Sequence, residues 1–292
     1  MRTRRTRALL FVCAVAAGCT SSGSEDAGAE LGTGASSSSG AGSLALVRLE
    51  RLAPDETEPP RVVANARVAR YTGVDASAVL KLLGADVRDG ESCTLASRLD
   101  DFAMAPEARV ELLSVGEIGL RMGELSHTLS PRLFPDLTPT ASGWFYGTKA
   151  ELPLPRSEGD EYVLSAQGEQ GVGRFELSVA APGEVSQVEL GGTAVERDAV
   201  LARRGDVELT WEPEDMRDRL ELEVVAAGAV LSCSVRDDGQ FTLGQGKLAS
   251  LEPDAHASLV LRRVRVVSTE MQGIDSAYVR LATTRTLPIR VE

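Results

Sequence analysis

The residues of this chain that could bind a metal ion or activate a substrate are mainly carboxylates, and they fall into four groups. Calcium needs about six to eight oxygen ligands from a preorganised loop, and none of the groups follows the EF-hand pattern. The simpler interpretation is a hairpin turn at residues 237–239 and solvated loops elsewhere. A calcium site at strand ends and a carboxylate pair for glycoside hydrolysis are the alternatives. The groups are Asp100-Asp101, Glu158-Gly159-Asp160-Glu161, Glu212-Pro213-Glu214-Asp215 with Asp218, and Asp237-Asp238-Gly239.

Histidine and cysteine give little support for a zinc centre. His127 and His256 lie in opposite halves of the chain, and neither belongs to an H-E-x-x-H sequence. No two of the four cysteines have the C-x-x-C spacing of a zinc site. We therefore predict no metal and no cofactor. The cysteines are Cys13, Cys19, Cys93 and Cys233.

Motifs for nucleophilic catalysis and phosphate binding are incomplete. The chain has no G-x-S-x-G sequence, which is typical of serine hydrolases. Gly244-Gln245-Gly246-Lys247 lacks the spacing of a phosphate-binding loop, and Leu248 stands where Ser or Thr would hold magnesium. A turn leading into residues 247–251 explains this segment. We predict no enzymatic activity, with a hydrolase of dispersed catalytic residues as an alternative.

Trp144, Phe145 and Tyr146 form the densest aromatic run in a chain with 4% aromatic residues. Successive side chains of a strand point to opposite faces, so at least one of the three should face outward. An exposed ring could stack on a sugar or contact a protein partner. The alternative is that loops around Pro139 and Pro153 cover the run.

The charge of the chain limits its partners. Its net charge is −12 at pH 7, and such a surface repels nucleic acids and anionic lipid head groups. We expect no nucleic-acid partner. The hydrophobic fraction of 43% is large enough to build hydrophobic cores.

The first nineteen residues predict export. Four arginines precede an apolar run from Ala8 to Ala17, which would rise only about 15 Å as a helix, half the thickness of a bilayer core. The segment therefore fits a secretory signal peptide at residues 1–18. Ala16-Ala17-Gly18-Cys19 resembles a bacterial lipobox, which implies cleavage before Cys19 and lipidation of this cysteine. Thr20 then implies the outer membrane, and an ordinary cleaved signal is the alternative.

Residues 19–43 are rich in Ser and Gly and predict a disordered tether. From Leu44 onward, apolar and charged residues alternate, which indicates strands. One helix is predicted over residues 76–83, with Asp75 as N-cap and Gly84 at its end. Five prolines between residues 131 and 155 predict long loops around one aromatic strand. The strand segments are 44–49, 66–71, 109–113 and 174–179.

Residues 181–184 predict a boundary between a β-rich domain at 44–181 and a β-sandwich domain at 182–292. About seven short strands in the second part are typical of a sandwich. The predicted fold class is mainly β, with two tandem β-rich domains and one short helix in the first. The strand candidates are 185–190, 207–211, 220–225, 230–235, 241–243, 259–267 and 278–291, the last interrupted at Pro288.

Two resemblances add to this interpretation. Val207-Glu208-Leu209-Thr210-Trp211-Glu212-Pro213 resembles the second strand of fibronectin type III domains, and Leu251-Glu252-Pro253 before residues 259–267 resembles the approach to their sixth strand. This resemblance implies an Ig-like sandwich for the second domain. The chain is also similar to uncharacterised bacterial lipoproteins, a resemblance that implies no activity. The residues that carry the second resemblance are Arg70-Tyr71-Thr72-Gly73, Arg132-Leu133-Phe134-Pro135-Asp136-Leu137 and 233–242.

Cys93 and Cys233 remain after the signal peptide and the lipidated cysteine are set aside. In an oxidising envelope they could form a disulfide, and two buried free thiols are the alternative. Together these features predict a lipid-anchored cell-envelope protein, on the periplasmic face or at the cell surface. It would act as a structural or interaction module with an envelope protein or glycan partner. A carbohydrate- or calcium-binding module is the alternative function.

Overall fold

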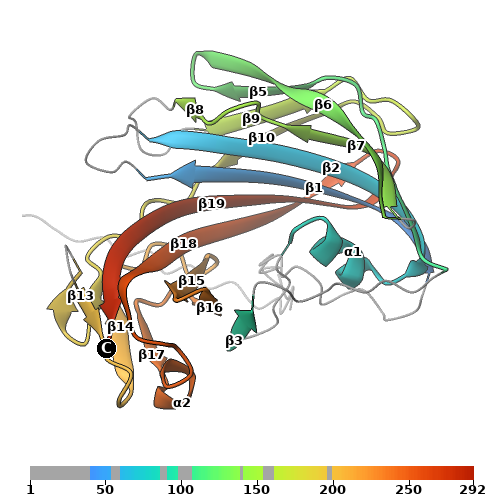
Figure 1. The fold of residues 1–292 in the computed structure, drawn as a ribbon. Coiled ribbons are helices and arrows are strands. Elements are labelled where there is room, and N and C mark those ends of the chain that lie inside the picture. The colour runs from blue at the N-terminus through green and yellow to red at the C-terminus, as the bar shows by residue number, and fades with distance from the viewer. Residues whose placement is uncertain are drawn as a thin grey trace, which may run out of the picture.

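The computed structural model describes residues 40–53, 60–85, 91–97, 107–138, 141–153, 161–195 and 199–292 (Figure 1). Within these ranges the protein is mainly β, as predicted, with nineteen strands and two short helices. The predicted signal peptide and the lipidation residue Cys19 lie outside the described residues. The elements are β1 (Gly40–Leu52), β2 (Arg61–Val74), α1 (Ala76–Leu82), β3 (Ser92–Ser97), β4 (Arg109–Leu112), β5 (Ile118–Met122), β6 (Leu125–Thr138), β7 (Ala141–Gly147), β8 (Leu152–Pro153), β9 (Glu161–Ala166), β10 (Phe175–Ala180), β11 (Glu189–Leu190), β12 (Thr193–Ala194), β13 (Ala199–Leu201), β14 (Val207–Thr210), β15 (Arg219–Ala226), β16 (Ala229–Arg236), β17 (Gln240–Leu243), α2 (Gln245–Leu248), β18 (Asp254–Met271) and β19 (Ile274–Val291).

Most strands belong to one fifteen-stranded sheet. Its main path is β10-β9-β5-β6-β7-β4-β2-β1-β19-β18-β15-β16-β3, and β12-β11-β14-β17 form a separate small sheet. The parallel pairing of β1 with β19 places the first and last described strands side by side. The two parts expected as tandem domains, residues 44–181 and 182–292, therefore share a sheet.

Two main hydrophobic clusters lie along this sheet. The first lies among β1, β2, β5, β9 and β10, and the second packs β14 of the small sheet against β15, β16, β18 and β19. The long curved hairpin of β18 and β19 passes through both (Figure 1). Its far end contributes Met271, Val279 and Leu281 to the first cluster, and its near end contributes Leu259, Leu261 and Ile289 to the second. The second part of the chain therefore completes the core of the first.

The helix α1 forms as predicted. Its N-cap, Asp75, accepts a 2.8 Å hydrogen bond from the amide of Ala78, which satisfies a free donor of the first turn. Gly84 adopts a φ of +85°, a left-handed conformation that glycine tolerates after a helix. Val79 and Leu80 pack with Leu44 and Leu46 of β1, so α1 covers one face of the sheet.

Strand β1 begins within the predicted tether, which was expected to extend to residue 43. Gly42 lies opposite Tyr71, and a β-carbon on Gly42 would meet the Tyr71 ring. Ser43 donates from its amide and its hydroxyl to the Asp275 carboxylate, at 2.8 and 2.9 Å. Backbone pairing and polar contacts thus extend the strand through residues too small and polar to signal it in the sequence.

Three further details of secondary structure differ from expectation. Pro131 lies inside the long strand β6, where loops were predicted. The pairing of β6 with β5 ends at Leu129, so at Pro131 the strand has β7 as its neighbour on one side. The amide hydrogen that proline lacks is therefore not needed for a second neighbouring strand. Pro288 lies inside an uninterrupted β19, opposite Ser258. Residues 245–248 form the one-turn helix α2 rather than a simple turn.

Candidate functional site

The acidic groups of the second half are held by a buried arginine. Arg263 of β18 is only 2% exposed. Its Nη1 donates to the Glu184 carbonyl at 2.9 Å and to Oε2 of Glu214 at 3.1 Å, and its Nη2 donates to the Glu212 carbonyl at 2.5 Å. Its Nε lies 2.8 Å from Oδ2 of Asp237, an ion-pair contact without the angle of a hydrogen bond. We call Arg263, Trp211, Glu212, Glu214 and Asp237 the Arg263 hub.

Asp237 is the fully buried acid of this hub. Its exposed fraction is 0%, and its Oδ1 accepts a 2.6 Å hydrogen bond from Nε1 of Trp211. Its Oδ2 accepts from the Glu214 amide at 3.2 Å. A buried carboxylate needs such partners, because desolvation of an unpaired charge costs several kcal/mol. The Asp237 carboxylate is therefore a structural group of the core.

Arg265, on the same face of β18 as Arg263, forms an ion pair with Asp218. Arg265 contacts Asp218 through two parallel bonds, Nε to Oδ1 at 2.8 Å and Nη2 to Oδ2 at 2.6 Å. The Asp218 carboxylate raises the pKa of Arg265 above its ordinary value. A calcium ion at residues 212–218 would have to displace both arginines from Glu214 and Asp218. The acidic groups at 100–101 and 158–160 lie outside the described residues, and Glu161 is an exposed residue at the start of β9.

The segment predicted as a domain boundary is fixed to the β18 and β19 hairpin through its backbone. Side chains of the hairpin donate to carbonyl groups of this segment and of the residues on either side of it, so the boundary cannot act as a free linker while these bonds hold. The donors and acceptors are Arg265 to Ala180 (3.4 Å), Thr283 to Pro182 (2.6 Å), Arg263 to Gly183 (3.5 Å) and Glu184 (2.9 Å), and Arg285 to Val185 (3.0 Å).

Asp215, at the exposed end of the loop at residues 212–218, gives a prediction about pH. Hydrogen bonds from Arg217 lower the pKa of Asp215 to about 2. The contribution of Asp215 to stability is present above its unfolded pKa of about 4 and is lost as the pH falls toward 2. In Arg217→Ala, we expect the Asp215 pKa to rise by about one unit or more, measured by NMR titration of the carboxyl carbon. An unchanged Asp215 pKa would contradict this assignment.

Cys93 and Cys233 form a disulfide with an S–S distance of 1.99 Å. Cys93 lies in β3 and Cys233 in β16, directly opposite each other in the strand register. The bond attaches a strand from the first part of the chain to the sheet edge of the second part. Strand β3 of the first part thus joins the sheet of the second part, whereas the end of the β18–β19 hairpin packs in the core of the first part.

A basic and aromatic surface lies on the face of the sheet that carries α1. Residues opposite each other in neighbouring strands share a face, and the register pairs Arg132 with Phe145, Leu46 with Arg67, and Arg48 with Asn65. The β2–β7 register, with Asn65 opposite Gly147, places Phe145 beside Arg67. We call Arg48, Asn65, Arg67, Arg132 and Phe145 the arginine face.

The aromatic run divides between two faces, as the strand period predicts. Tyr146 is fully buried, and its hydroxyl accepts a 2.8 Å hydrogen bond from the Val115 amide. Trp144 is partly buried and packs on the first core. Phe145 points to the opposite face and is half-buried. The predicted aromatic contact surface is therefore reduced to Phe145, because the other two rings belong to the core side.

Two guanidinium groups lie over the Phe145 ring. The Cζ atoms of Arg67 and Arg132 are 5.9 and 6.0 Å from the ring centroid, within the range of a cation–π contact. Arg67 also donates from Nη1 to the Leu83 carbonyl at 2.5 Å, so it satisfies the C-terminal end of α1. Arg132 is exposed.

Arg48 and Asn65 carry buried polar atoms without partners. Nε of Arg48 and Oδ1 of Asn65 are inaccessible to solvent and make no hydrogen bond within the part of the chain that the structure describes. Burial and the nearby charge of Arg280 lower the pKa of Arg48 below its ordinary value. Buried polar atoms in folded proteins nearly always have partners, so this pair requires an explanation.

The carboxylates on the same face belong to a neighbouring set of ion pairs. Arg280 contacts Glu221 at 2.5 Å, and Arg262 contacts Glu223 at 2.8 Å and Glu50 at 3.3 Å. Burial acts to raise the pKa of Glu50, but a hydrogen bond from Thr284 and the charge of Arg262 outweigh it and lower the pKa. Sequence reasoning missed the arginine face because alternating arginines in a strand are ordinary for a solvated surface.

Comparisons with known proteins add no assignment. No protein-family model matches the chain, and no curated protein matches it significantly. What this protein does must therefore be argued from its own geometry.

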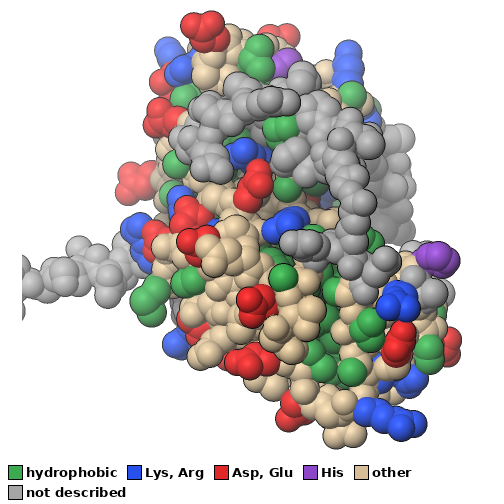
Figure 2. All heavy atoms as spheres, turned by 90° about the vertical axis from the view of Figure 1, so that its left-hand side faces the viewer, with side chains coloured by type: hydrophobic (Ala, Val, Ile, Leu, Met, Phe, Trp, Pro, Cys, Tyr) green, Lys and Arg blue, Asp and Glu red, His purple; other side chains and the backbone are tan. Residues whose placement is uncertain are grey.

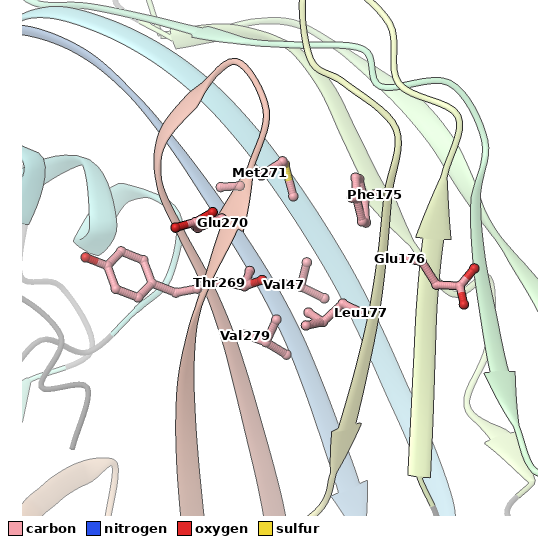
Figure 3. A pocket seen from close by; sticks show the side chains of 11 residues that line it. Val47, Phe175, Glu176, Leu177, Thr269, Glu270, Met271 and Val279 are labelled. Carbon is pink, nitrogen blue, oxygen red and sulfur yellow. The ribbon is translucent and has the colours of Figure 1, made fainter. Parts of the chain in front are cut away.

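A small cavity lies between β10 and the end of the β18–β19 hairpin (Figure 3). Val47, Leu177 and Val279 point into it, whereas Glu176 points away. Its volume is about 20 Å³, enough for one water molecule. The cavity is thus an imperfection in the first core and too small for a substrate.

The outer surface shows mixed charge. On the face in Figure 2, acidic and basic side chains are interspersed, and hydrophobic side chains gather in the lower half, over the C-terminal strands. Neither helix in the described ranges has the length and apolar character needed to cross a membrane. In these ranges, no three or more His, Cys, Asp or Glu side chains are grouped to hold a metal ion.

Proposed function

We propose that this protein is a non-catalytic binding module of the bacterial cell envelope, attached to the membrane by lipid on Cys19. The observation that carries the proposal is the Arg263 hub. In this hub, acidic side chains that could have bound a cation or taken part in a reaction are held by Arg263, which also fixes the backbone directly after the predicted boundary. The module is built as a rigid support for a contact surface.

The disulfide between Cys93 and Cys233 supports the location. Structural disulfides persist in oxidising compartments such as the periplasm and the cell surface, and are rare in the cytosol. The sequence features before Cys19 point to the same compartment. Residues 19–39 would then provide the spacer between lipid and folded part.

The anchor is tested by mass spectrometry of the mature amino terminus from membrane fractions. We expect a chain that begins at Cys19 and carries acyl groups, because several buried acyl chains make membrane attachment effectively permanent. Cys19→Ala should move the protein into the soluble fraction, and Cys13→Ala is the matched control that should not. Recovery of the full leader with its arginines from the cytosol would overturn the proposal.

The binding role is tested by chemical crosslinking in intact envelopes, followed by purification of the protein. A defined protein or glycan that is recovered repeatedly would support a binding module. Recovery of the monomer alone, from envelopes in which a known lipoprotein complex is captured, would contradict it.

A further inference from the structure

We propose that the gap between β10 and residues 265–271 of β18 binds an extended segment of a partner protein, in which small apolar residues alternate with basic ones. We call this gap the seam. The inference rests on the proposed function, because it names the partner class of the binding module. It is carried by two strand edges without backbone partners, by the apolar cavity between them and by unpaired carboxylates beside them.

Each side of the seam is the free edge of a strand. Strand β10 is the last strand of the large sheet and pairs with β9 alone. The pairing of β18 with β15 ends at Val264, and beyond this residue β18 pairs with β19 alone. Every second residue of such an edge directs its amide and its carbonyl away from the sheet. Both edges therefore present hydrogen-bonding groups that an added strand would satisfy.

The seam is wider than the spacing of a strand pair. Most Cα atoms of β10 lie more than 8 Å from every Cα atom of β18, whereas neighbouring paired strands are about 4.8 Å apart. At one end the Gly173 amide donates to the Gln272 carbonyl at 2.8 Å. At the other end a side chain bridges the strands, because Arg265 Nη1 donates to the Ala180 carbonyl at 3.4 Å. An added strand would enter at this second end, where the bond that has to open is exposed.

The inner side of the seam is apolar and has room for small side chains only. The cavity of about 20 Å³ lies here, and Val47, Leu177 and Val279 point into it (Figure 3). Leu177 and Val267, one from each edge, are only partly buried and pack on the first core. A cavity that holds one water molecule also fits a group of about that size, such as a methyl. The inward residues of the bound segment should therefore be alanine near the centre of the seam.

The solvent side of the seam is acidic. Glu176 of β10 and Glu270 of β18 are exposed, and neither forms an ion pair within the part of the chain that the structure describes. Glu161 of the neighbouring β9 is exposed on the same face as Glu176, and the exposed Arg174 lies at the closed end of the seam. Successive side chains of a strand point to opposite faces, so a segment with small residues inward would place its other residues beside these carboxylates. Lysine or arginine at those positions complements their charge.

The test is fluorescence anisotropy of labelled seven-residue peptides with the full chain in detergent. The probe has the sequence Val-Lys-Ala-Lys-Ala-Lys-Val, and its controls are Val-Ala-Ala-Val-Lys-Lys-Lys and the probe with N-methylated amides. We expect saturable binding of the probe and about tenfold or weaker binding of both controls, because the first loses the alternation and the second loses the backbone donors. Equal affinity for the probe and either control would overturn the proposal.

Variants and crosslinks locate the site. The double variant Glu176→Gln with Glu270→Gln should weaken binding of the probe about threefold or more at low salt. Glu189→Gln, at an exposed position in β11 of the small sheet, is the control and should bind as the wild type does. A photoreactive probe should crosslink to the tryptic fragments 175–197 and 266–280.

Circular dichroism spectra verify that each variant is folded. Unchanged affinity in the folded double variant, or crosslinks confined to other fragments, would overturn the site. A lipidated Cys19 and a partner crosslinked in intact envelopes would then leave the proposed function standing.

Discussion

Arg263→Met is expected to lower the free energy of unfolding by about 3–5 kcal/mol. The substitution leaves the Asp237 carboxylate in the core without its counter-ion, and it removes the donors to the carbonyl groups of Glu184 and Glu212. Breaking one side of a buried ion pair is costly because the remaining charge stays desolvated. Urea denaturation followed by far-ultraviolet circular dichroism measures this loss.

Arg290→Met is the matched control for this prediction. Arg290 is 45% exposed and forms an ion pair with Glu292, which is 60% exposed, so its substitution should change stability by about 1 kcal/mol or less. A second test combines Arg263→Met with Asp237→Asn, which removes the stranded charge. The double variant should lose less stability than the two single losses added together. A loss below about 1 kcal/mol for Arg263→Met would contradict the hub.

Removal of the disulfide is expected to cost about 2–5 kcal/mol of stability. Cys93 and Cys233 are 140 residues apart, so the bond closes a loop through most of the folded chain. For a loop of this length, the entropic account gives a contribution of about 5 kcal/mol. Urea denaturation of the wild type with and without reductant measures the difference.

The double variant Cys93→Ala with Cys233→Ala provides the control. It should unfold slightly below the midpoint of the reduced wild type, and reductant should not move it further. Cys233 is 1% exposed, so alanine there also leaves a small cavity that lowers both midpoints slightly. A wild-type midpoint that does not respond to complete reduction would show that the bond contributes nothing.

Local features of this fold could be predicted from the sequence. Helix α1 has an acidic N-cap and a terminal glycine, and most strands show the two-residue period that places their apolar side chains on one face. These signals depend on neighbours in the chain. The mainly β class followed from them.

Pairing between distant strands could not be predicted, because alternation fixes the face of a strand but not its partner. Nothing in residues 44–52 indicates a parallel neighbour at 276–284. The Arg263 hub depends on the same long-range register, since Arg263 and Asp237 are ordinary charged residues in their own segments. The arginine face was hidden for this reason too, because it combines residues of β1, β2, β6 and β7.

We expect the two parts of the chain to unfold as one cooperative unit, and Trp211 offers the most direct test. Trp144→Phe leaves Trp211, in the second core, as the sole tryptophan, and circular dichroism follows the strands of both parts. Urea unfolding of this variant should give coincident transitions by fluorescence and by circular dichroism. A circular dichroism curve with two steps, only one of which coincides with the Trp211 transition, would contradict the account.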